Sequence, residues 1–368
     1  MSRSGKPSNA RPASPKASSG TSVPVRPASL KDIASRLGIS IATVSRALQG
    51  NPAVSSGTRE RVMEAAREMH YAKNFIADSL RSGSLPVVGV IVPHGVTLFY
   101  SSVLDGIESV AAREGYAVIS MNSHESYEEE CRNLHSLAAF HVAGVIASVT
   151  QETEDSSHFD ALAAEGIPVV FVARAIGGAQ SKREGADYSS VTADSVEAAR
   201  RATLHLVRQG CRRIAVLCGP GRLRMVAERK HGYIEALHET GLPVRPDYVA
   251  YSDIDTASAI GVTDALMDLP EPPDAILALN DTLLFAAMKA LKRRGFDMPR
   301  DVALIGFSDV EYAADVSPSL STIEDRSRLM GEEACMTLIG HIRGDAKPVH
   351  KVIPTVQRIR ESSRRNVE

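Results

Sequence analysis

The sequence predicts an α/β protein with a small helical N-terminal domain and a large core of doubly wound parallel sheets. Short, continuous apolar runs recur between amphipathic segments from residue 86 to about residue 360, as expected for buried parallel strands alternating with helices. Two short amphipathic helices are predicted earlier, over residues 29–50. The charged residues are also unevenly distributed along the chain. Residues 1–85 hold 13 Lys and Arg but 5 Asp and Glu, whereas the whole chain has a net charge of −2.

Residues 1–28 are rich in Ser, Pro, Ala and basic residues and contain no acid. They lack the apolar stretch of a secretory signal. Their composition is similar to that of a transit peptide, but a disordered tail is the simpler interpretation. We expect no functional site in this segment.

The first predicted helix begins at Ser29, which can cap it. Asp32 lies three residues later and completes a capping box. Ala34 is small and allows a second helix to cross closely. Gly38 lies where the chain must turn through a left-handed backbone angle.

The second predicted helix is capped by Ser40 and buries Val44 and Leu48. Its outer face carries short or polar side chains at its start: Ile41, Ala42, Ser45 and Arg46. Two such helices joined by a tight turn form a helix-turn-helix, whose second helix enters the major groove of DNA. The basic N-terminal part is consistent with this interpretation, because basic side chains attract phosphates.

Ser55 can cap a third helix over residues 57–69, and a short segment follows over residues 71–85. The whole stretch resembles the headpiece and hinge of the lac repressor family (LacI/GalR regulators). The resemblance rests on Leu30-Lys-Asp-Ile-Ala, Thr43-Val-Ser-Arg, Val54-Ser55, Thr58-Arg-Glu-Arg-Val and Asn74…Ala77…Leu80-Arg-Ser-Gly. It continues to about residue 360. We therefore expect a DNA-binding domain at residues 29–70 and a hinge at residues 71–85.

The resemblance implies how these residues contact DNA. Leu80 would wedge into the minor groove at the centre of the operator, with Ala77 packed beside it. A linker residue without a DNA role is the alternative for Leu80. The hinge departs from the family at Lys73, where Pro is usual, and at Asp78, where an acidic residue opposes DNA contact.

Arg46 is the candidate for bidentate contact with a guanine, which supplies about 1–3 kcal/mol of discrimination. Ile41 and Ala42 match the specificity positions of the family, and their apolar side chains favour contact with thymine methyl groups. The remaining candidates would hold phosphates and register. They are Thr43, Ser45, Ser55, Thr58, Tyr71 and Asn74.

The core alternates predicted strands and helices. The strands are expected at residues 87–92, 117–120, 144–147, 168–172, 213–217, 274–279 and 302–307. The helices are expected near residues 100–114, 128–140, 194–209, 223–240, 256–268 and 281–295. This length suits two lobes, the first at about 86–190 and 308–340, the second at about 191–307 and 341–360. The resemblance implies the periplasmic-binding-protein fold, with an effector cleft between the lobes.

Ligands of open α/β sheets bind beyond the carboxyl ends of the strands. The candidates at these positions are Phe99, Tyr100, Arg174, Asn280, Asp281 and Ser308. The resemblance adds Arg229, which matches the Arg before the Gly-Tyr of the family, and Ile254, where some relatives carry an aromatic residue that stacks on the ligand. Simpler roles are open for four of them. Asp281 could only cap a helix, Arg229 could be a solvated helix residue, and the two aromatic rings could only pack. The resemblance implies a sugar or related metabolite as the effector. Ala173 and Ser308 stand where the family usually has Asp, and the chain has no Trp, so the sequence favours no specific sugar.

Other chemistry is weakly supported. His124, Cys131 and His135 could bind a metal, but structural zinc sites usually have four ligands at closer, paired spacings. Cys218-Gly-Pro-Gly lacks the rest of a phosphate-binding loop. The four scattered cysteines indicate reduced thiols in the cytosol. We expect no enzyme activity and no cofactor.

The sequence therefore predicts a cytoplasmic transcriptional regulator, most simply a repressor. It would bind a palindromic operator as a homodimer, under the control of a small-molecule effector. No apolar run approaches the ~18 residues of a membrane span. A solute-binding transport protein is the rival from another class, but it would need a signal peptide and would have no helix-turn-helix. The polar residues 355–368 contain no leucine heptads, which disfavours a tetramerising coiled coil.

Overall fold

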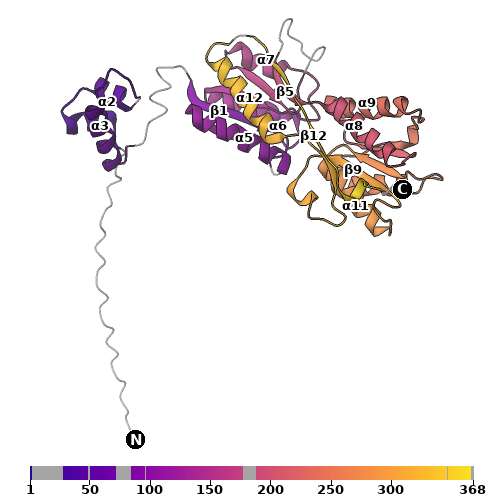
Figure 1. Cartoon of the computed structure of the whole chain (residues 1–368). Coiled ribbons are helices and arrows are strands. Elements are labelled where there is room, and N and C mark those ends of the chain that lie inside the picture. The colour runs from indigo at the N-terminus through magenta and orange to yellow at the C-terminus, as the bar shows by residue number, and fades with distance from the viewer. Residues whose placement is uncertain are drawn as a thin grey trace. The chain divides into compact units, whose positions relative to one another are not determined.

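The computed structural model contains two compact units, Met1–Asn74 and Phe75–Glu368, which are described separately (Figure 1). The described residues are 1, 28–48, 50–71, 84–95, 97–176, 188–345 and 347–365. Some residues singled out in the tail and hinge lie outside them. These are residues 2–27, Lys73, Asn74, Ala77, Asp78 and Leu80.

The headpiece is a three-helix unit made of α1 (Leu30–Leu37), α2 (Ile41–Leu48) and α3 (Ser56–Glu68). Ser29 and Asp32 form the predicted capping box, and Gly38 adopts the predicted left-handed conformation with φ of 66°. The Ser40 hydroxyl accepts a hydrogen bond from the Thr43 amide at 3.1 Å and so caps α2. These caps fix where each helix begins and ends.

The headpiece core is formed by the inner faces of all three helices. Ile33, Val44 and Val62 are completely buried at its centre, and Ala47 is buried beside them. Arg36 of α1 pairs with Glu68 of α3. The headpiece is therefore held by a small apolar core and by polar links between helices.

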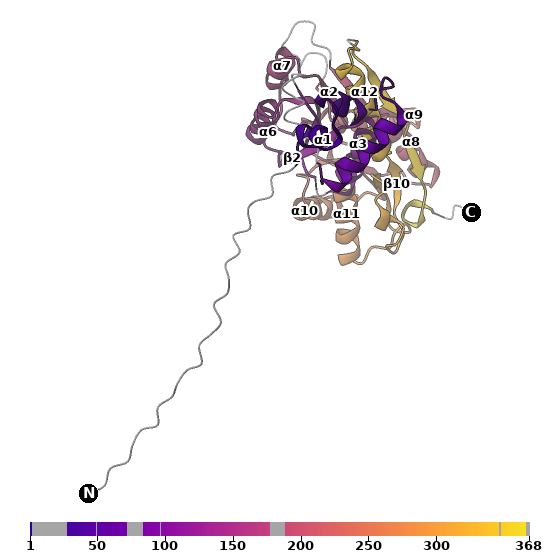
Figure 2. The same ribbon diagram turned by 90° about the vertical axis from the view of Figure 1, so that its left-hand side faces the viewer.

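The first lobe is a parallel sheet with strand order β11-β5-β4-β3-β1-β2. Its strands are β1 (Leu85–Val92), β2 (Ala117–Asn122), β3 (Val142–Ala147), β4 (Val169–Val172), β5 (Ser189–Ala193) and β11 (His350–Ile353). Helices α5 (Leu98–Glu114) and α12 (Ser327–Ile342) cover one face and lie side by side (Figure 1). Helices α6 (Tyr127–Ala139) and α7 (Ser157–Ala164) cover the other (Figure 2).

The second lobe repeats this arrangement with strand order β12-β10-β9-β8-β6-β7. Its strands are β6 (Ile214–Cys218), β7 (Val249–Tyr251), β8 (Ala275–Ala278), β9 (Ala303–Phe307), β10 (Ser321–Glu324) and the antiparallel β12 (Val356–Arg358). Helices α8 (Ser195–Arg208) and α9 (Arg224–Glu239) cover one face, and α10 (Thr256–Met267) and α11 (Asp281–Arg293) cover the other (Figure 2). Three 3-10 turns complete the lobe, at Pro246–Tyr248, Glu311–Ala313 and Glu361–Ser363.

Each lobe has one pair of helices that cross very closely, and glycine makes this possible. A Cβ at Gly331 of α12 would collide with the Val103 carbonyl of α5, and a Cβ at Gly232 of α9 would collide with the Val196 carbonyl of α8. The two lobes therefore use the same packing device on corresponding faces.

The predicted fold class is confirmed, since both sheets are doubly wound. All seven predicted core strands and all six predicted core helices correspond to observed elements. The sequence reading did not assign β5, β7, β10, β11, β12, α7 or α12. No helix in the described part of the chain is long and apolar enough to cross a bilayer.

The lobe boundaries differ from the expected ones. The chain returns to the first lobe after β10, near residue 325, rather than near residue 308. Residues 350–353 belong to the first sheet, although we expected residues 341–360 in the second. The expectation failed because β10 and β11 are short and partly polar, which gives no continuous apolar run.

The chain crosses between the lobes three times, after β5, after β10 and after β11. Asp194 at the first crossing accepts a hydrogen bond from the Thr355 amide at 2.9 Å. Arg201 donates to the Thr355 hydroxyl at 2.6 Å. The first and third crossings are thus bonded to one another, while Asp325 forms the second.

Candidate DNA-reading face and interlobe cleft

The outer face of α2 carries the candidate base-reading residues. Ile41 is 47% exposed, and Ala42 and Arg46 are exposed as well. Thr43 and Ser45 are partly buried, and the Thr43 hydroxyl lies 2.8 Å from that of Ser40. An exposed isoleucine at the first position of a helix has no packing role in this unit, so it is available to a partner.

The arginines of the headpiece fall into two kinds. Arg36 pairs with Glu68, and Arg59 donates to the Asn51 carbonyl at 3.0 Å. The Arg46 side chain has no such partner among the described residues. The headpiece therefore uses some arginines to hold its helices and leaves Arg46 free on the outer face.

The remaining headpiece candidates have structural roles of their own. Ser55 caps α3 by accepting from the Thr58 amide, and the two hydroxyls lie 2.9 Å apart. Tyr71 packs partly buried against the headpiece core. Asn74, Ala77 and Leu80 lie outside the described residues.

All eight cleft candidates line one cavity of about 80 Å³ between the two lobes, which we call the aromatic cavity. They are Phe99, Tyr100, Arg174, Arg229, Ile254, Asn280, Asp281 and Ser308. Further lining residues that the sequence did not single out are His94, Thr97, Leu223, Met225, Val226, Leu279, Thr282 and Asp325. Asp325 follows β10, so the rule that ligands lie beyond strand ends would have identified it had that strand been recognised.

Arg229 of α9 is the most buried charged residue of this cavity. Its side chain is 2% exposed, and its guanidinium lies 3.7 Å from the centre of the Phe307 ring. It donates to the Leu279 carbonyl at 2.6 Å and to the Asp325 carboxylate at 2.9 Å. The alternative of a solvated helix residue is therefore wrong. Burial raises the pKa of Asp325, and the charge of Arg229 opposes this rise.

Arg174, which follows β4, is the cleft arginine of the first lobe. One of its nitrogens donates to both oxygens of Glu125 at 2.9 Å, and the side chains of both residues are 9% exposed. Glu125 also accepts from the Gln151 amide at 2.9 Å. Each lobe thus neutralises its own cleft arginine with a carboxylate from the same lobe.

Asn280 and Asp281 share the start of α11 but have different roles. Asn280 is the helix cap, because its side chain accepts from the Leu283 amide at 2.8 Å. Asp281 is the first helical residue and accepts from the Thr282 amide at 2.9 Å. The alternative that Asp281 caps the helix is therefore wrong. Burial raises the pKa of Asp281, and it lacks a basic partner among the described residues.

The aromatic pair forms one wall of the cavity. The rings of Phe99 and Tyr100 meet edge to face, with centroids 5.1 Å apart. The Tyr100 hydroxyl lies 2.9 Å from that of Ser148. Burial raises the pKa of Tyr100, so its phenol stays neutral at physiological pH. The wall is consequently an uncharged aromatic surface.

Ala173 and Ser308 occupy equivalent places, after β4 and β9. Both have positive φ angles, of 61° and 66°, which side chains other than glycine rarely adopt. Ser308 donates to Asp325 at 3.3 Å. The segments that follow β4 and β9 therefore both line the aromatic cavity.

Comparison with known proteins supports both parts of the molecule. Residues 29–74 match the family described as "Bacterial regulatory proteins, lacI family", and residues 203–363 match "Periplasmic binding protein-like domain". The repressor PurR of Vibrio parahaemolyticus is 31% identical over 321 residues, covering 86% of this chain and 92% of PurR. The repressor CytR of Escherichia coli K12 is 29% identical over 317 residues, covering 86% of this chain and 90% of CytR.

A solved structure agrees in fold. The lac repressor dimer bound to operator and the anti-inducer ONPF has a TM-score of 0.78 and 25% identity. The match covers 92% of this chain and 99% of that one. The similarity therefore includes the helical headpiece region and both lobes.

Proposed function

Because the chain belongs to the lacI family of bacterial regulatory proteins, we propose that α2 reads an operator and that an effector in the aromatic cavity controls this binding. The family consists of transcriptional repressors that are not enzymes. The observation that carries the proposal is the outer face of α2, where Arg46 is exposed and free of partners among the described residues. We further propose that the protein works in the cytoplasm.

At the operator, Arg46 makes the bidentate contact with a guanine, and Ile41 and Ala42 meet thymine methyl groups. Thr43, Ser45, Ser55, Thr58 and Tyr71 hold phosphates or fix the register. Asn74, Ala77 and Leu80 act in the hinge, as the family resemblance implies. Two copies of the chain place two α2 helices in successive major grooves, so the operator is a pseudo-palindrome.

The effector lies against Phe99, Tyr100 and Ile254, with Asn280 and Asp281 as its hydrogen-bonding partners. Arg174, Arg229 and Ser308 complete the cavity. Asp325 links this cavity to the second crossing between the lobes, because it bonds Arg229 and directly precedes Arg326 and α12. An effector that draws Arg229 away from Asp325 changes the forces at that crossing.

Such coupling is reciprocal. The factor by which the effector changes operator affinity equals the factor by which the operator changes effector affinity. Both factors can be measured independently on the same protein.

The test is selection of bound sequences from a random DNA library by the full-length protein. We expect a two-fold symmetric site. Arg46→Ala should abolish the preference at one base position of each half-site. Arg67→Ala, which removes an exposed arginine of α3, is the matched control and should leave the preference intact. Unchanged discrimination in the Arg46 variant would refute the assignment of that residue.

A further inference from the structure

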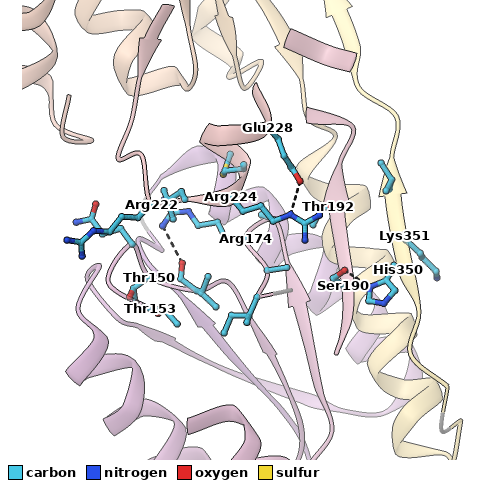
Figure 3. A pocket seen from close by; sticks show the side chains of 18 residues that line it. Thr150, Thr153, Arg174, Ser190, Thr192, Arg222, Arg224, Glu228, His350 and Lys351 are labelled. Atoms are coloured by element: carbon cyan, nitrogen blue, oxygen red, sulfur yellow. Dashed lines mark hydrogen bonds and ion pairs between the residues drawn. The ribbon is translucent and has the colours of Figure 1, made fainter. Parts of the chain in front are cut away.

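A second cavity of about 350 Å³ lies beside the aromatic cavity (Figure 3). We call it the arginine cavity, after Arg222 and Arg224 at the start of α9. The two cavities share four lining residues, Ala173, Arg174, Leu223 and Met225. The two cavities therefore adjoin one another at these side chains.

The sizes of the two cavities favour such an extended ligand. Pockets for small molecules usually measure about 300–1,000 Å³. The aromatic cavity, at about 80 Å³, is well below this range, while the arginine cavity, at about 350 Å³, is within it. In the described conformation, the aromatic cavity accommodates only a small part of an effector.

The charges of the two cavities differ. In the aromatic cavity, Arg174 is neutralised by Glu125 and Arg229 by Asp325. Asp281 remains as the carboxyl without a basic partner among the described residues. Both arginines of this cavity are therefore already paired with carboxylates, which disfavours binding of a negatively charged group there.

The arginine cavity has available cations. The side chain of Arg222 is 74% exposed and lies 3.9 Å from Glu154, which is itself exposed. Arg224 is 61% exposed and bonds Glu228 of the same helix at 2.8 Å. Exposed pairs of this kind contribute about 0–1 kcal/mol, so a ligand anion can replace the carboxylate at small cost. The guanidinium fork matches phosphate and carboxylate groups in two parallel hydrogen bonds.

Neutral hydroxyl groups complete the lining. Figure 3 shows Thr150 and Thr153 on one side of the cavity, and Ser190 and Thr192 near the edge of the first sheet. Glu228 is the one carboxylate among the described lining residues, whereas Arg222, Arg224 and Lys351 are basic. Because basic side chains outnumber carboxylates and hydroxyl groups are also present, the lining favours an anion that carries additional oxygens for hydrogen bonding.

We propose that the effector is an elongated small molecule with a neutral part in the aromatic cavity and a phosphate or carboxylate group in the arginine cavity, held by Arg222 and Arg224. This inference rests on the proposed function, because it describes the ligand of the same regulatory cleft. It adds the chemical class of the ligand and the residues that select it.

The experiment measures binding of inorganic phosphate to the full-length protein by calorimetric titration, with malonate as the carboxylate probe. We expect phosphate or malonate to bind the unaltered protein and to bind the Arg222→Gln/Arg224→Gln double variant at least tenfold more weakly. Glu228→Gln should strengthen binding severalfold, because it frees Arg224. An opposite change in the two variants cannot result from misfolding.

Two controls exclude other sites. Arg300→Gln removes an arginine of the second lobe that is also 74% exposed, and it should leave phosphate binding unchanged. Arg67→Ala, which removes an exposed arginine of the headpiece, should do the same. The stronger of the two probes identifies the anionic group. Equal binding by the double variant, or no binding of either probe at 20-fold the protein concentration and above, would overturn the proposal.

Failure of this inference is distinguishable from failure of the proposed function. Operator selection by the unaltered protein tests DNA binding without any effector. A protein with a symmetric operator but no anion binding keeps the proposed function and loses this inference. A protein with anion binding but no operator preference keeps the anion site but loses the proposed function, and with it the role of the ligand as an effector.

Discussion

Helix α2 of the headpiece and the aromatic cavity of the core use arginine in opposite ways. In the core, Arg174 and Arg229 are buried, and each is bonded to a carboxylate of its own lobe. In the headpiece, Arg46 is exposed and has no partner among the described residues. A buried arginine without its carboxylate would destabilise the fold, whereas an exposed arginine remains hydrated and free.

These arginines therefore contribute to different properties, some to folding and regulation and one to DNA recognition. The cleft arginines are part of the architecture of the lobes, so changes there should alter folding and regulation together. Arg46 makes no contact that holds the headpiece together, so its removal should alter DNA recognition alone. The predictions below test this separation, beginning with the largest effect.

Asp325→Ala should have the largest effect. It leaves Arg229 charged and buried without its partner, and breaking a buried pair in this way costs about 3–5 kcal/mol. We expect the free energy of unfolding of the core to fall by that amount in urea denaturation followed by circular dichroism.

The control for this prediction is the double variant Arg229→Met/Asp325→Leu. Because it removes both charges, it should recover much of the lost stability. A double variant no more stable than Asp325→Ala would show that the charge pair is not the cause.

Glu125→Gln should have the next largest effect. It leaves Arg174 without its counter-charge, but an amide oxygen can still accept hydrogen bonds from Arg174 and the Gln151 amide. We expect a loss of about 1–3 kcal/mol, in the range for removing a hydrogen-bonded partner of a charged group. Denaturation of Glu128→Gln, an exposed position at the start of α6, is the control.

Arg46→Ala should reduce operator discrimination by about 1–3 kcal/mol, as expected for one bidentate base contact. The unfolding free energy of the headpiece should change by less than about 0.5 kcal/mol, since the side chain is exposed. A clear loss of stability would contradict the separation drawn above.

Arg36→Ala should slightly lower the stability of the headpiece. It breaks the exposed pair with Glu68 that joins α1 to α3, which contributes about 0–1 kcal/mol. High salt should weaken this contribution in the unaltered protein. Thermal unfolding in low and high salt measures both effects.

Asp281 should give the core a weak dependence on pH. Burial raises its pKa in the folded state, so the native protein keeps a proton that the unfolded chain loses near pH 3.8. The stability from this group is therefore complete below pH 3.8 and is lost as the pH rises through the raised pKa. Asp281→Asn should abolish this decline, which denaturation across the acidic range would reveal.

The local signals in the sequence predicted the headpiece and the cleft well. Capping by Ser29, Ser40 and Ser55 depends on nearby residues, so it is visible in the sequence. Most of the eight cleft candidates surround one cavity because they follow strands whose apolar runs are continuous, whereas Arg229 and Ile254 were found through the family resemblance. Their roles in binding remain predictions.

The parts that escaped prediction depend on contacts distant in sequence. Strands β5, β10 and β11 contain Ser, Thr, His or Lys, and each forms only when a neighbouring strand supplies its hydrogen bonds. Because β10 was not predicted, Asp325 was not identified as a cleft residue, and the return of the chain to the first lobe was placed too early. Glu125 lies in a turn, and only the folded chain brings it to Arg174.

The last two strands have a consequence for the synthesis of the protein. β11 completes the edge of the first sheet and β12 the edge of the second, and both lie within residues 350–358. A chain emerging from the ribosome therefore carries two unfinished sheets until residues 350–358 have been translated. The two halves of the effector cleft therefore receive their last strands within the same short stretch of synthesis.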